Sequence, residues 1–177
     1  MHTKLLKKLL VNFFIPIFWG VAIAIIINLL FMRTTVPTGS MLPTIQLNDT
    51  LLVQRIYTPH SLTRGDIIVF QPNVEEGSDL YIKRLIGLPG DTIEFKLIDG
   101  TSTVWINDEL LDEPYVALSS NEEITKTFIV PDDCYFFLGD NRKDSLDSRY
   151  WKNSYIHESQ IKGKMIFNLT QFLKQLL

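Results

Sequence analysis

The longest uninterrupted apolar stretch lies near the start of the chain. No charged residue occurs from Val11 to Met32, and the apolar pattern is interrupted only by Asn12, Pro16 and Asn28. A helix rises about 1.5 Å per residue, so this stretch covers the roughly 30 Å hydrocarbon thickness of a bilayer. The pattern predicts one transmembrane helix over residues 11–32, preceded by a basic segment at 1–10.

The charges that flank this segment predict its orientation. Lys4, Lys7 and Lys8 precede it, and the first acidic residue is Asp49. Because positive charge is retained on the cytoplasmic side, we expect a cytoplasmic N-terminus and an exported remainder, as in a single-pass protein of the cell membrane.

A cleaved secretion signal is the alternative interpretation of the same segment. It also has a basic start, an apolar stretch and small residues such as Ala22 and Ala24. These alanines are followed by further apolar sequence, however, and the stretch exceeds the usual core of about 7–15 residues. The pattern therefore favours an uncleaved anchor.

After Arg33 the pattern changes to short apolar runs separated by turn residues, which is typical of an all-β domain. The expected strands are Thr50–Ile56, Asp66–Gln71, Leu80–Ile86, Thr92–Leu97, Thr103–Ile106, Thr127–Val130, Cys134–Leu138 and Lys162–Phe167. We therefore predict a mainly β fold, with an antiparallel β domain over residues 33–170.

Turn residues indicate that several of these strands are joined locally. Leu88-Pro89-Gly90-Asp91 suits a turn in which glycine takes a positive φ, and Asp99-Gly100 and Asn107-Asp108 suit hairpin tips. The more polar stretch at about 99–121 predicts a small lobe inserted in the main sheet. For the tail at 171–177, an amphipathic turn on the bilayer and a frayed end are both open.

Composition narrows the functions that the exported part can have. Three of the 17 Lys and Arg residues precede the apolar segment, which leaves 14 basic residues against 20 acidic ones. This excess of negative charge argues against nucleic acid as a partner. The single cysteine, Cys134, cannot form an intramolecular disulfide, and its apolar neighbours favour an inert core thiol over a nucleophile.

A constrained serine follows the apolar segment. Ser40 lies within Pro37-Thr38-Gly39-Ser40-Met41-Leu42-Pro43-Thr44, eight residues past Met32. Eight extended residues reach at most about 26–29 Å, so Ser40 is expected near the membrane surface. The prolines and glycine restrict the backbone, which suits a side chain presented in one place; an ordinary turn serine is the alternative.

Two adjacent basic residues interrupt an apolar strand. In Tyr81-Ile82-Lys83-Arg84-Leu85-Ile86 the side chains of Lys83 and Arg84 point to opposite faces, so at least one is expected to be partly buried. A desolvated lysine can lose its proton, whereas arginine does not readily do so. The alternative is a lysine that extends to solvent or forms a simple ion pair.

A serine hydroxyl needs a nearby base to become a nucleophile. His2 is expected in the cytoplasm, His60 lies in a loop and His157 lies in a polar stretch, so Lys83 is the best candidate base. The scattered histidines lack metal-ligand spacing, and we expect neither a catalytic metal nor a cofactor. A third polar cluster, Gly139–Arg149, follows an apolar strand and suits either a solvated loop or a wall that supports a site.

Together these pieces resemble bacterial type I signal peptidases, the membrane-bound enzymes that release exported proteins from their signal peptides. The resemblance runs from about Val36 to Phe167, through the blocks PTGSMLPT, GDIIVF, YIKRLIGLPGD and GDNRKDSLDSR in the family's order. It implies a serine endopeptidase with a Ser-Lys pair and a largely antiparallel β domain. The implied partners are preproteins, membrane lipid and, as an open possibility, the export machinery.

The resemblance also implies a role for individual residues. Ser40 is the nucleophile and Lys83 the neutral general base, while Thr38 and the backbone N–H of Ser40 form the oxyanion hole. Ser145 orients the lysine, and supporting ion pairs join Asp147 with Arg149 and Asp140 with Arg84. The substrate binds as an extended strand along Val36, Pro37, Met41, Tyr81 and Ile82, with small side chains at the first and third positions before the cut.

The sequence departs from the family at a few positions. Thr38 stands where many members have serine, and Lys143-Asp144 replaces the commoner Asp-Asn. There is one anchor rather than two, and the polar lobe is short. Two alternative functions stay open: a related Ser-Lys peptidase dedicated to one secretion or pilus client, and a membrane-tethered β module that binds exported peptides without cleaving them.

Overall fold

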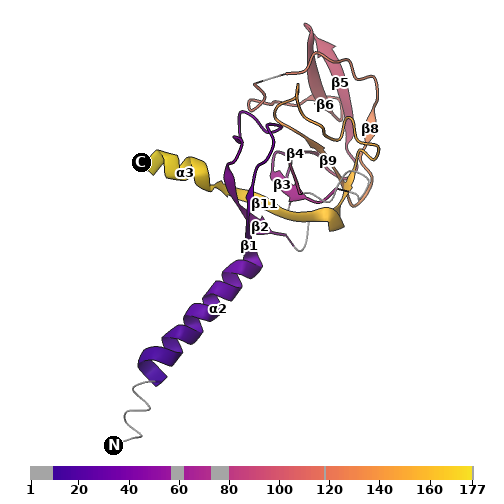
Figure 1. The fold of residues 1–177 in the computed structure, drawn as a ribbon. Coiled ribbons are helices and arrows are strands. Elements are labelled where there is room, and N and C mark those ends of the chain that lie inside the picture. The colour runs from indigo at the N-terminus through magenta and orange to yellow at the C-terminus, as the bar shows by residue number, and fades with distance from the viewer. Residues whose placement is uncertain (1–9, 57–61, 73–79, 118, 177) are drawn as a thin grey trace, which may run out of the picture. The chain divides into compact units, whose positions relative to one another are not determined.

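The computed structural model describes residues 10–56, 62–72, 80–117 and 119–176. It divides into two compact units at Met32–Arg33 (Figure 1). In the first unit a short π-helix, η1 (Leu10–Phe14), leads into the α-helix α2 (Ile15–Leu30). The predicted basic segment at 1–10 lies almost entirely outside the described residues.

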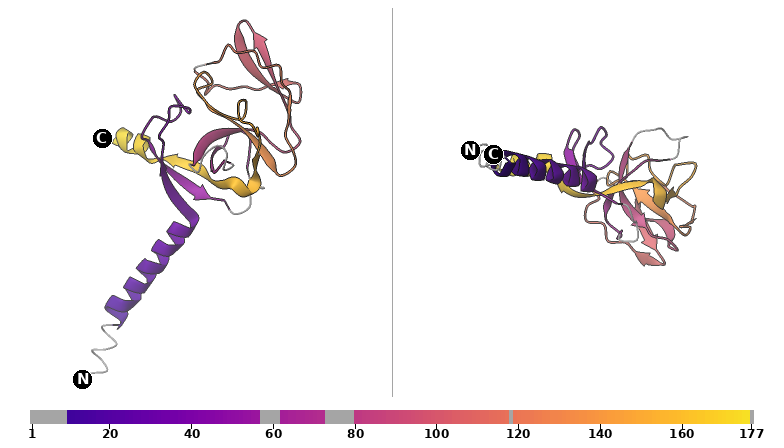
Figure 2. Two further views of the ribbon diagram at one scale, coloured as in Figure 1. Left: turned by 45° about the vertical axis from the view of Figure 1, so that its right-hand side comes forward. Right: turned by 90° about the horizontal axis from the view of Figure 1, so that it is seen from below.

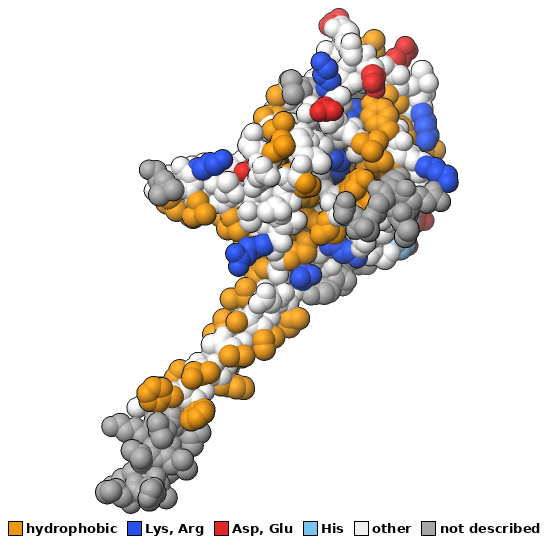
Figure 3. All heavy atoms as spheres, in the orientation of Figure 1, with side chains coloured by type: hydrophobic (Ala, Val, Ile, Leu, Met, Phe, Trp, Pro, Cys, Tyr) orange, Lys and Arg blue, Asp and Glu red, His pale blue; other side chains and the backbone are white. Residues whose placement is uncertain are grey.

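The apolar segment forms a helix that is long enough to cross a membrane. The span from Val11 to Leu30 is 20 residues long, and none of it is buried inside the protein. On the face seen in Figure 3, apolar side chains occur along its length and no charged side chain interrupts them. Asn28 adds little polarity, because its side-chain amide donates to the carbonyl of Ala24 at 2.9 Å. A helix that is apolar on every face suits a lipid environment.

The second unit is built on a seven-stranded antiparallel sheet. Its strand order is β1-β2-β11-β3-β4-β9-β10. The strands are β1 (Phe31–Thr35), β2 (Thr50–Arg55), β3 (Ile67–Phe70), β4 (Tyr81–Gly87), β9 (Cys134–Leu138), β10 (Ile156–His157) and β11 (Ile161–Asn168). The late strand β11 pairs with β2 on one edge and with β3 on the other.

A smaller four-stranded sheet has the order β7-β6-β5-β8. It consists of β5 (Thr92–Ile98), β6 (Thr101–Ile106), β7 (Glu109–Leu110) and β8 (Phe128–Ile129). The hairpin of β5 and β6 projects at the end of the β domain remote from β2 (Figures 1 and 2). Its tip residues Asp99 and Gly100 have φ of 50° and 75°, and Asn107 and Asp108 at the next tip have 51° and 68°. Positive φ at both central residues is what the type I′ turn of a two-residue hairpin requires.

Among the described residues, apolar clusters pack on opposite faces of β4 and β9. Leu85 and Phe137 contribute to one cluster, with Phe70 and Trp151, and their neighbours in sequence Ile86 and Phe136 contribute to the other. Alternate side chains of a strand point to opposite faces, so both faces of these central strands are covered. Lys83 and Arg84 therefore emerge from a rigid, buried strand.

The predicted fold class is confirmed: the domain is mainly antiparallel β, and one N-terminal apolar helix precedes it. Each of the expected strands overlaps an observed one, whereas β1 and the two-residue strands β7 and β10 were not predicted. The chain ends in a helix, α3 (Leu169–Leu176), where the sequence left a helical turn and a frayed end open. The domain boundaries, including the lobe at 99–121, stay predictions.

Candidate active site

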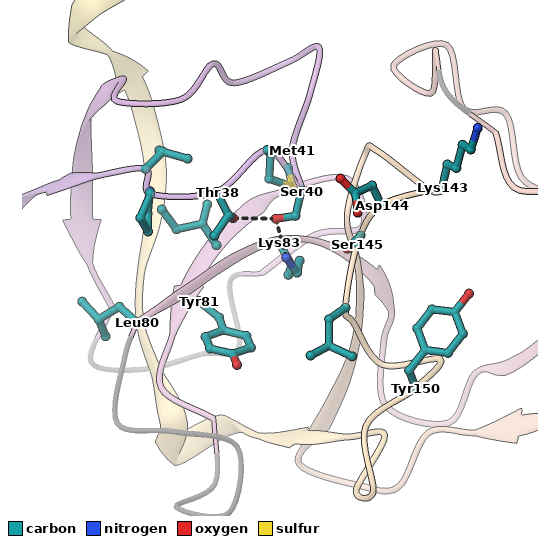
Figure 4. A pocket seen from close by; sticks show the side chains of 15 residues that line it. Thr38, Ser40, Met41, Leu80, Tyr81, Lys83, Lys143, Asp144, Ser145 and Tyr150 are labelled. Carbon is teal, nitrogen blue, oxygen red and sulfur yellow. Dashed lines mark hydrogen bonds between the residues drawn. The ribbon is translucent and has the colours of Figure 1, made fainter.

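Ser40 and Lys83 meet in the second unit although 43 positions separate them in the chain. Ser40 lies in the loop between β1 and β2, and Lys83 lies in β4. The Lys83 amine donates to the Ser40 hydroxyl oxygen at 2.5 Å (Figure 4). Only 8% of Ser40 and 5% of Lys83 are exposed. The fold thus brings the candidate nucleophile and base into direct contact at a site where both side chains have little exposure to solvent.

The loop that carries Ser40 is held from two sides. Within it, the amide of Leu42 donates to the Gly39 carbonyl at 3.1 Å. Across from it, Asn141 donates its backbone N–H to the Ser40 carbonyl at 3.1 Å and its side-chain amide to the Gly39 carbonyl at 3.2 Å. The residues after β9 therefore fix the position of the serine backbone.

Gly139 allows this close approach. A Cβ at this position would lie 2.2 Å from the Ser145 hydroxyl and 2.5 Å from the Ser40 carbonyl oxygen. Both distances are too short for any side chain, so only glycine lets the end of β9 reach the loop that carries Ser40.

Burial changes the proton affinity of Lys83. The pKa of its amine is lowered from 10.5 to about 8, chiefly because burial disfavours the ammonium form. The negative charges of Asp147 and Asp140 oppose this effect, and the positive charge of Arg149 adds to it. An amine with a pKa near 8 is partly neutral at physiological pH, as a general base must be.

Thr38 places a second hydroxyl beside the serine. Its Oγ1 lies 3.3 Å from the Ser40 Oγ (Figure 4). The hydroxyl is thus within reach of any charge that develops on a group bonded to Ser40.

Two ion pairs lie behind Lys83. Arg149 Nε lies 2.7 Å from Asp147, whose other oxygen accepts the Gly139 N–H at 3.0 Å. Arg84 contacts both oxygens of Asp140, at 2.7 and 2.5 Å. Asp147 and Asp140 are completely buried, which is tolerated because each carboxylate has a cationic partner. Both Lys83 and Arg84 are buried, so the expectation from the strand pattern holds for both faces.

Ser145 lines the same cavity as Ser40 and Lys83, but its hydroxyl does not form the expected contact with Lys83. It is buried, and its hydroxyl has no hydrogen-bond partner among the residues that the structure describes. No hydrogen bond joins it to Lys83 in this arrangement, so its role in orienting the lysine stays a prediction.

Sequence reasoning missed a set of supporting residues from the segment after β7. Glu113 accepts from the Arg142 guanidinium at 2.7 Å, and the Tyr115 hydroxyl donates to Glu113 at 3.0 Å. The Arg84 guanidinium lies 3.8 Å from the centre of the Tyr115 ring. Burial raises the pKa of Tyr115, which keeps its hydroxyl protonated. A Glu-Pro-Tyr sequence in a polar stretch carries no local signal for such long-range contacts.

A cavity of about 640 Å³ opens over the Ser40–Lys83 pair. All five residues predicted to bind substrate line it: Val36, Pro37, Met41, Tyr81 and Ile82. The remaining lining residues include Lys143, Asp144, Ser145, Leu146 and Tyr150. The cavity therefore extends to both sides of the candidate pair (Figure 4).

Potential metal ligands are scattered over the part of the chain that the structure describes. No group of three or more His, Cys, Asp or Glu residues there could hold a metal ion. His157 bonds to Ser159 at 2.9 Å, while His2 and His60 lie outside the described residues.

Comparisons with known proteins point in one direction. The family model described as signal peptidase, peptidase S26, matches residues 8–170. A probable signal peptidase I-2 from Synechocystis sp. is 43% identical over 134 residues, or 73% of this chain and 58% of that protein. A signal peptidase I from Bacillus caldolyticus is 35% identical over 171 residues, or 87% of this chain and 89% of that protein. The chain thus spans little more than half of the Synechocystis relative but nearly all of the Bacillus one.

A solved structure is also similar. A crystal structure of a signal peptidase I from Enterococcus faecalis V583 has 34% sequence identity and a TM-score of 0.48, and the match covers 60% of this chain and 97% of that chain. The region matched by the family model contains both Ser40 and Lys83.

Proposed function

Because the chain belongs to the signal peptidase family, peptidase S26, we propose that it is a serine endopeptidase that removes N-terminal signal peptides from exported preproteins. The observation that carries this proposal is the 2.5 Å contact between the buried Lys83 amine and the Ser40 hydroxyl. A lysine with a pKa of about 8 is a competent base at that distance.

The proposed reaction begins with proton transfer. Neutral Lys83 takes the proton of the Ser40 hydroxyl as its oxygen attacks the scissile carbonyl. The oxyanion that forms is stabilised by the Ser40 backbone N–H and the Thr38 hydroxyl. The Lys83 ammonium then gives its proton to the departing amine, which leaves the signal peptide as an ester of Ser40. In the second half of the reaction Lys83 takes a proton from a water molecule that attacks the ester. Lys83 then returns the proton to the Ser40 oxygen as the signal peptide leaves with a free carboxylate.

The cavity suits an extended apolar peptide. Val36 and Met41, at 2% and 1% exposure, form a closed apolar surface beside Ser40, and Ile82 is 7% exposed. We infer that small side chains at the first and third positions before the cut pack here, in a peptide bound as an added strand. The same apolar surroundings keep water away from Lys83.

We also propose that the reaction takes place at the outer face of the cytoplasmic membrane. The basic residues before α2 favour an N-terminus inside the cell, and α2 is long enough to reach the other side. An impermeant maleimide tests this in intact cells, in a Cys134→Ser background. Asn121→Cys should be labelled and His2→Cys should not; the reverse pattern would refute the orientation.

Cleavage itself is tested with the full chain in detergent micelles and a purified preprotein, with the cut located by mass spectrometry. Ser40→Ala and Lys83→Met should each lower the rate at least about 10³-fold. The matched controls are Ser154→Ala, a buried serine away from the cavity, and Lys96→Met, a lysine paired with Glu94 on the surface. Full turnover in both site variants would instead favour a module that binds peptides without cleaving them.

A further inference from the structure

The loop from Ser145 to Tyr150 has an inverted pattern of exposure. Its polar members Asp147, Ser148 and Arg149 are 0%, 0% and 9% exposed, whereas Leu146 is 61% and Tyr150 45% exposed. A surface loop ordinarily turns its charges to water and its apolar groups inward. Exposed apolar groups that adjoin one another and are rimmed by polar residues are found at ligand-binding grooves.

The inversion follows from how the loop is attached to β9. Ser148 donates its N–H to the Phe137 carbonyl at 3.1 Å and accepts the Phe137 N–H with its hydroxyl at 2.9 Å. Asp147 binds the Gly139 N–H and Arg149, as described above. Because these polar groups are needed on the inner side, Leu146 and Tyr150 are left on the outer side.

Tyr150 is also held in place by its own contacts. Its hydroxyl bonds to Glu122, and its ring lies over the Arg149 guanidinium, 4.8 Å from the ring centre. The pKa of Tyr150 is raised to about 12, first by burial and then by Glu122, so the hydroxyl remains a donor. These two contacts therefore fix the position of the Tyr150 ring at the side of the cavity.

Both apolar side chains line the cavity that contains Ser40 and Lys83. Figure 4 shows Tyr150 on the opposite side of the catalytic pair from Leu80 and Tyr81. The rim charges on this side, Lys143 and Asp144, are of opposite sign, and Lys143 extends away from Ser40 in Figure 4. This side of the cavity therefore presents apolar contacts to a bound molecule and carries no net charge.

We propose that Leu146 and Tyr150 form a subsite for the substrate segment that follows the scissile bond, and that they select an apolar side chain among its first three residues. This inference rests on the proposed function. The residues before the cut are assigned to the side of Val36, Pro37 and Ile82, so a chain that passes Ser40 continues on the side of Leu146 and Tyr150.

The test compares substrates within one enzyme preparation. Peptide substrates share one sequence before the cut and carry either Leu or Ser at the first, second or third position after it. With wild-type enzyme we expect kcat/KM to favour Leu about tenfold at one of these positions. Leu146→Ser and Tyr150→Ser should each reduce that preference to about twofold. Because the measure is a ratio, it does not depend on how much of a variant folds.

Ile129→Ser is the matched control, since Ile129 is 65% exposed but does not line the cavity. It should leave the preference unchanged. A wild-type ratio near one at all three positions, or an unchanged ratio in both subsite variants, would overturn the subsite. If wild-type enzyme cleaves none of the substrates while Ser40 is intact, the proposed function fails instead.

Discussion

Lys83 and Ser40 are joined by a hydrogen bond of 2.5 Å inside a site where each is more than nine-tenths buried. In the proposed reaction this contact lets Lys83 take the serine proton, and burial lowers the pKa of the amine to about 8. Its consequences can be measured as a dependence on pH.

The first prediction concerns the pH profile. Since the pKa of Lys83 is about 8 and only its neutral form accepts a proton, kcat/KM should rise with pH and level off above about 8. The Asp147 charge raises the pKa of Lys83, so Asp147→Asn should move the rise to lower pH. Steady-state kinetics from pH 6 to 10 check both. A rise that stays in place in the variant would mean that another group controls the profile.

The second prediction concerns stability. The pKa of Lys83 is about 8 in the folded chain and 10.5 in its reference state, so below pH 8 the folded protein carries a penalty of about 3 kcal/mol. Between these values the unfolded chain binds more protons, and the free energy of unfolding should rise with pH. Lys83→Met removes this dependence.

Thermal unfolding of the full chain in detergent, measured at several pH values, checks this dependence of stability on Lys83. The variant's advantage in Tm over wild type should be largest at pH 7 and shrink toward pH 10. Lys96→Met, at a partly exposed ion pair, should show no such trend. An advantage of the same size at both pH values would reflect packing by the methionine rather than the lost charge.

The third prediction isolates the hydroxyl of Thr38. Thr38→Val keeps the shape but removes the group that lies 3.3 Å from Ser40 Oγ. If that hydroxyl stabilises the oxyanion, kcat should fall about 10²–10³-fold with little change in KM. Thr38→Ser should retain most of the activity. Full activity in the valine variant together with a loss in the serine variant would point to the methyl group instead.

The fourth prediction concerns the Glu113–Arg142 pair. Glu113→Gln leaves the buried Arg142 guanidinium without its charged partner, and breaking a buried pair typically costs about 3–5 kcal/mol. Because Arg142 also donates to the Gly139 carbonyl at 3.0 Å, we expect kcat to fall as well as Tm. A replacement of both residues, Glu113→Leu with Arg142→Met, should recover much of the Tm but not the kcat. Recovery of both would assign the pair a purely structural role.

Local patterns account for much of this architecture. A continuous apolar stretch and period-two alternation depend only on neighbouring residues, so the helix α2 and the strands could be predicted. The opposite directions of Lys83 and Arg84 followed from the same alternation. The hairpin tips at Asp99-Gly100 and Asn107-Asp108 followed from the residues that accept positive φ.

Contacts that depend on the packing of distant segments could not be predicted in this way. Neither Glu113 nor Tyr115 shows in the sequence that it reaches Arg142 or Arg84, since these contacts exist only once the smaller sheet is in place. The need for glycine at position 139 likewise arises only when Ser40 and Ser145, which are distant from each other in sequence, pack against it. The insertion of β11 between β2 and β3 is decided by competition among strand pairings, which alternation does not encode.

That insertion has a consequence for how the site is assembled. Ser40 precedes β2 and Lys83 belongs to β4, and the strand that bridges β2 to β3, and so to β4, is formed by residues 161–168. A nascent chain still emerging during synthesis has both chemical groups but not the bridge that unites them. The link in the main sheet between the Ser40 side and the Lys83 side therefore depends on β11 pairing with both β2 and β3.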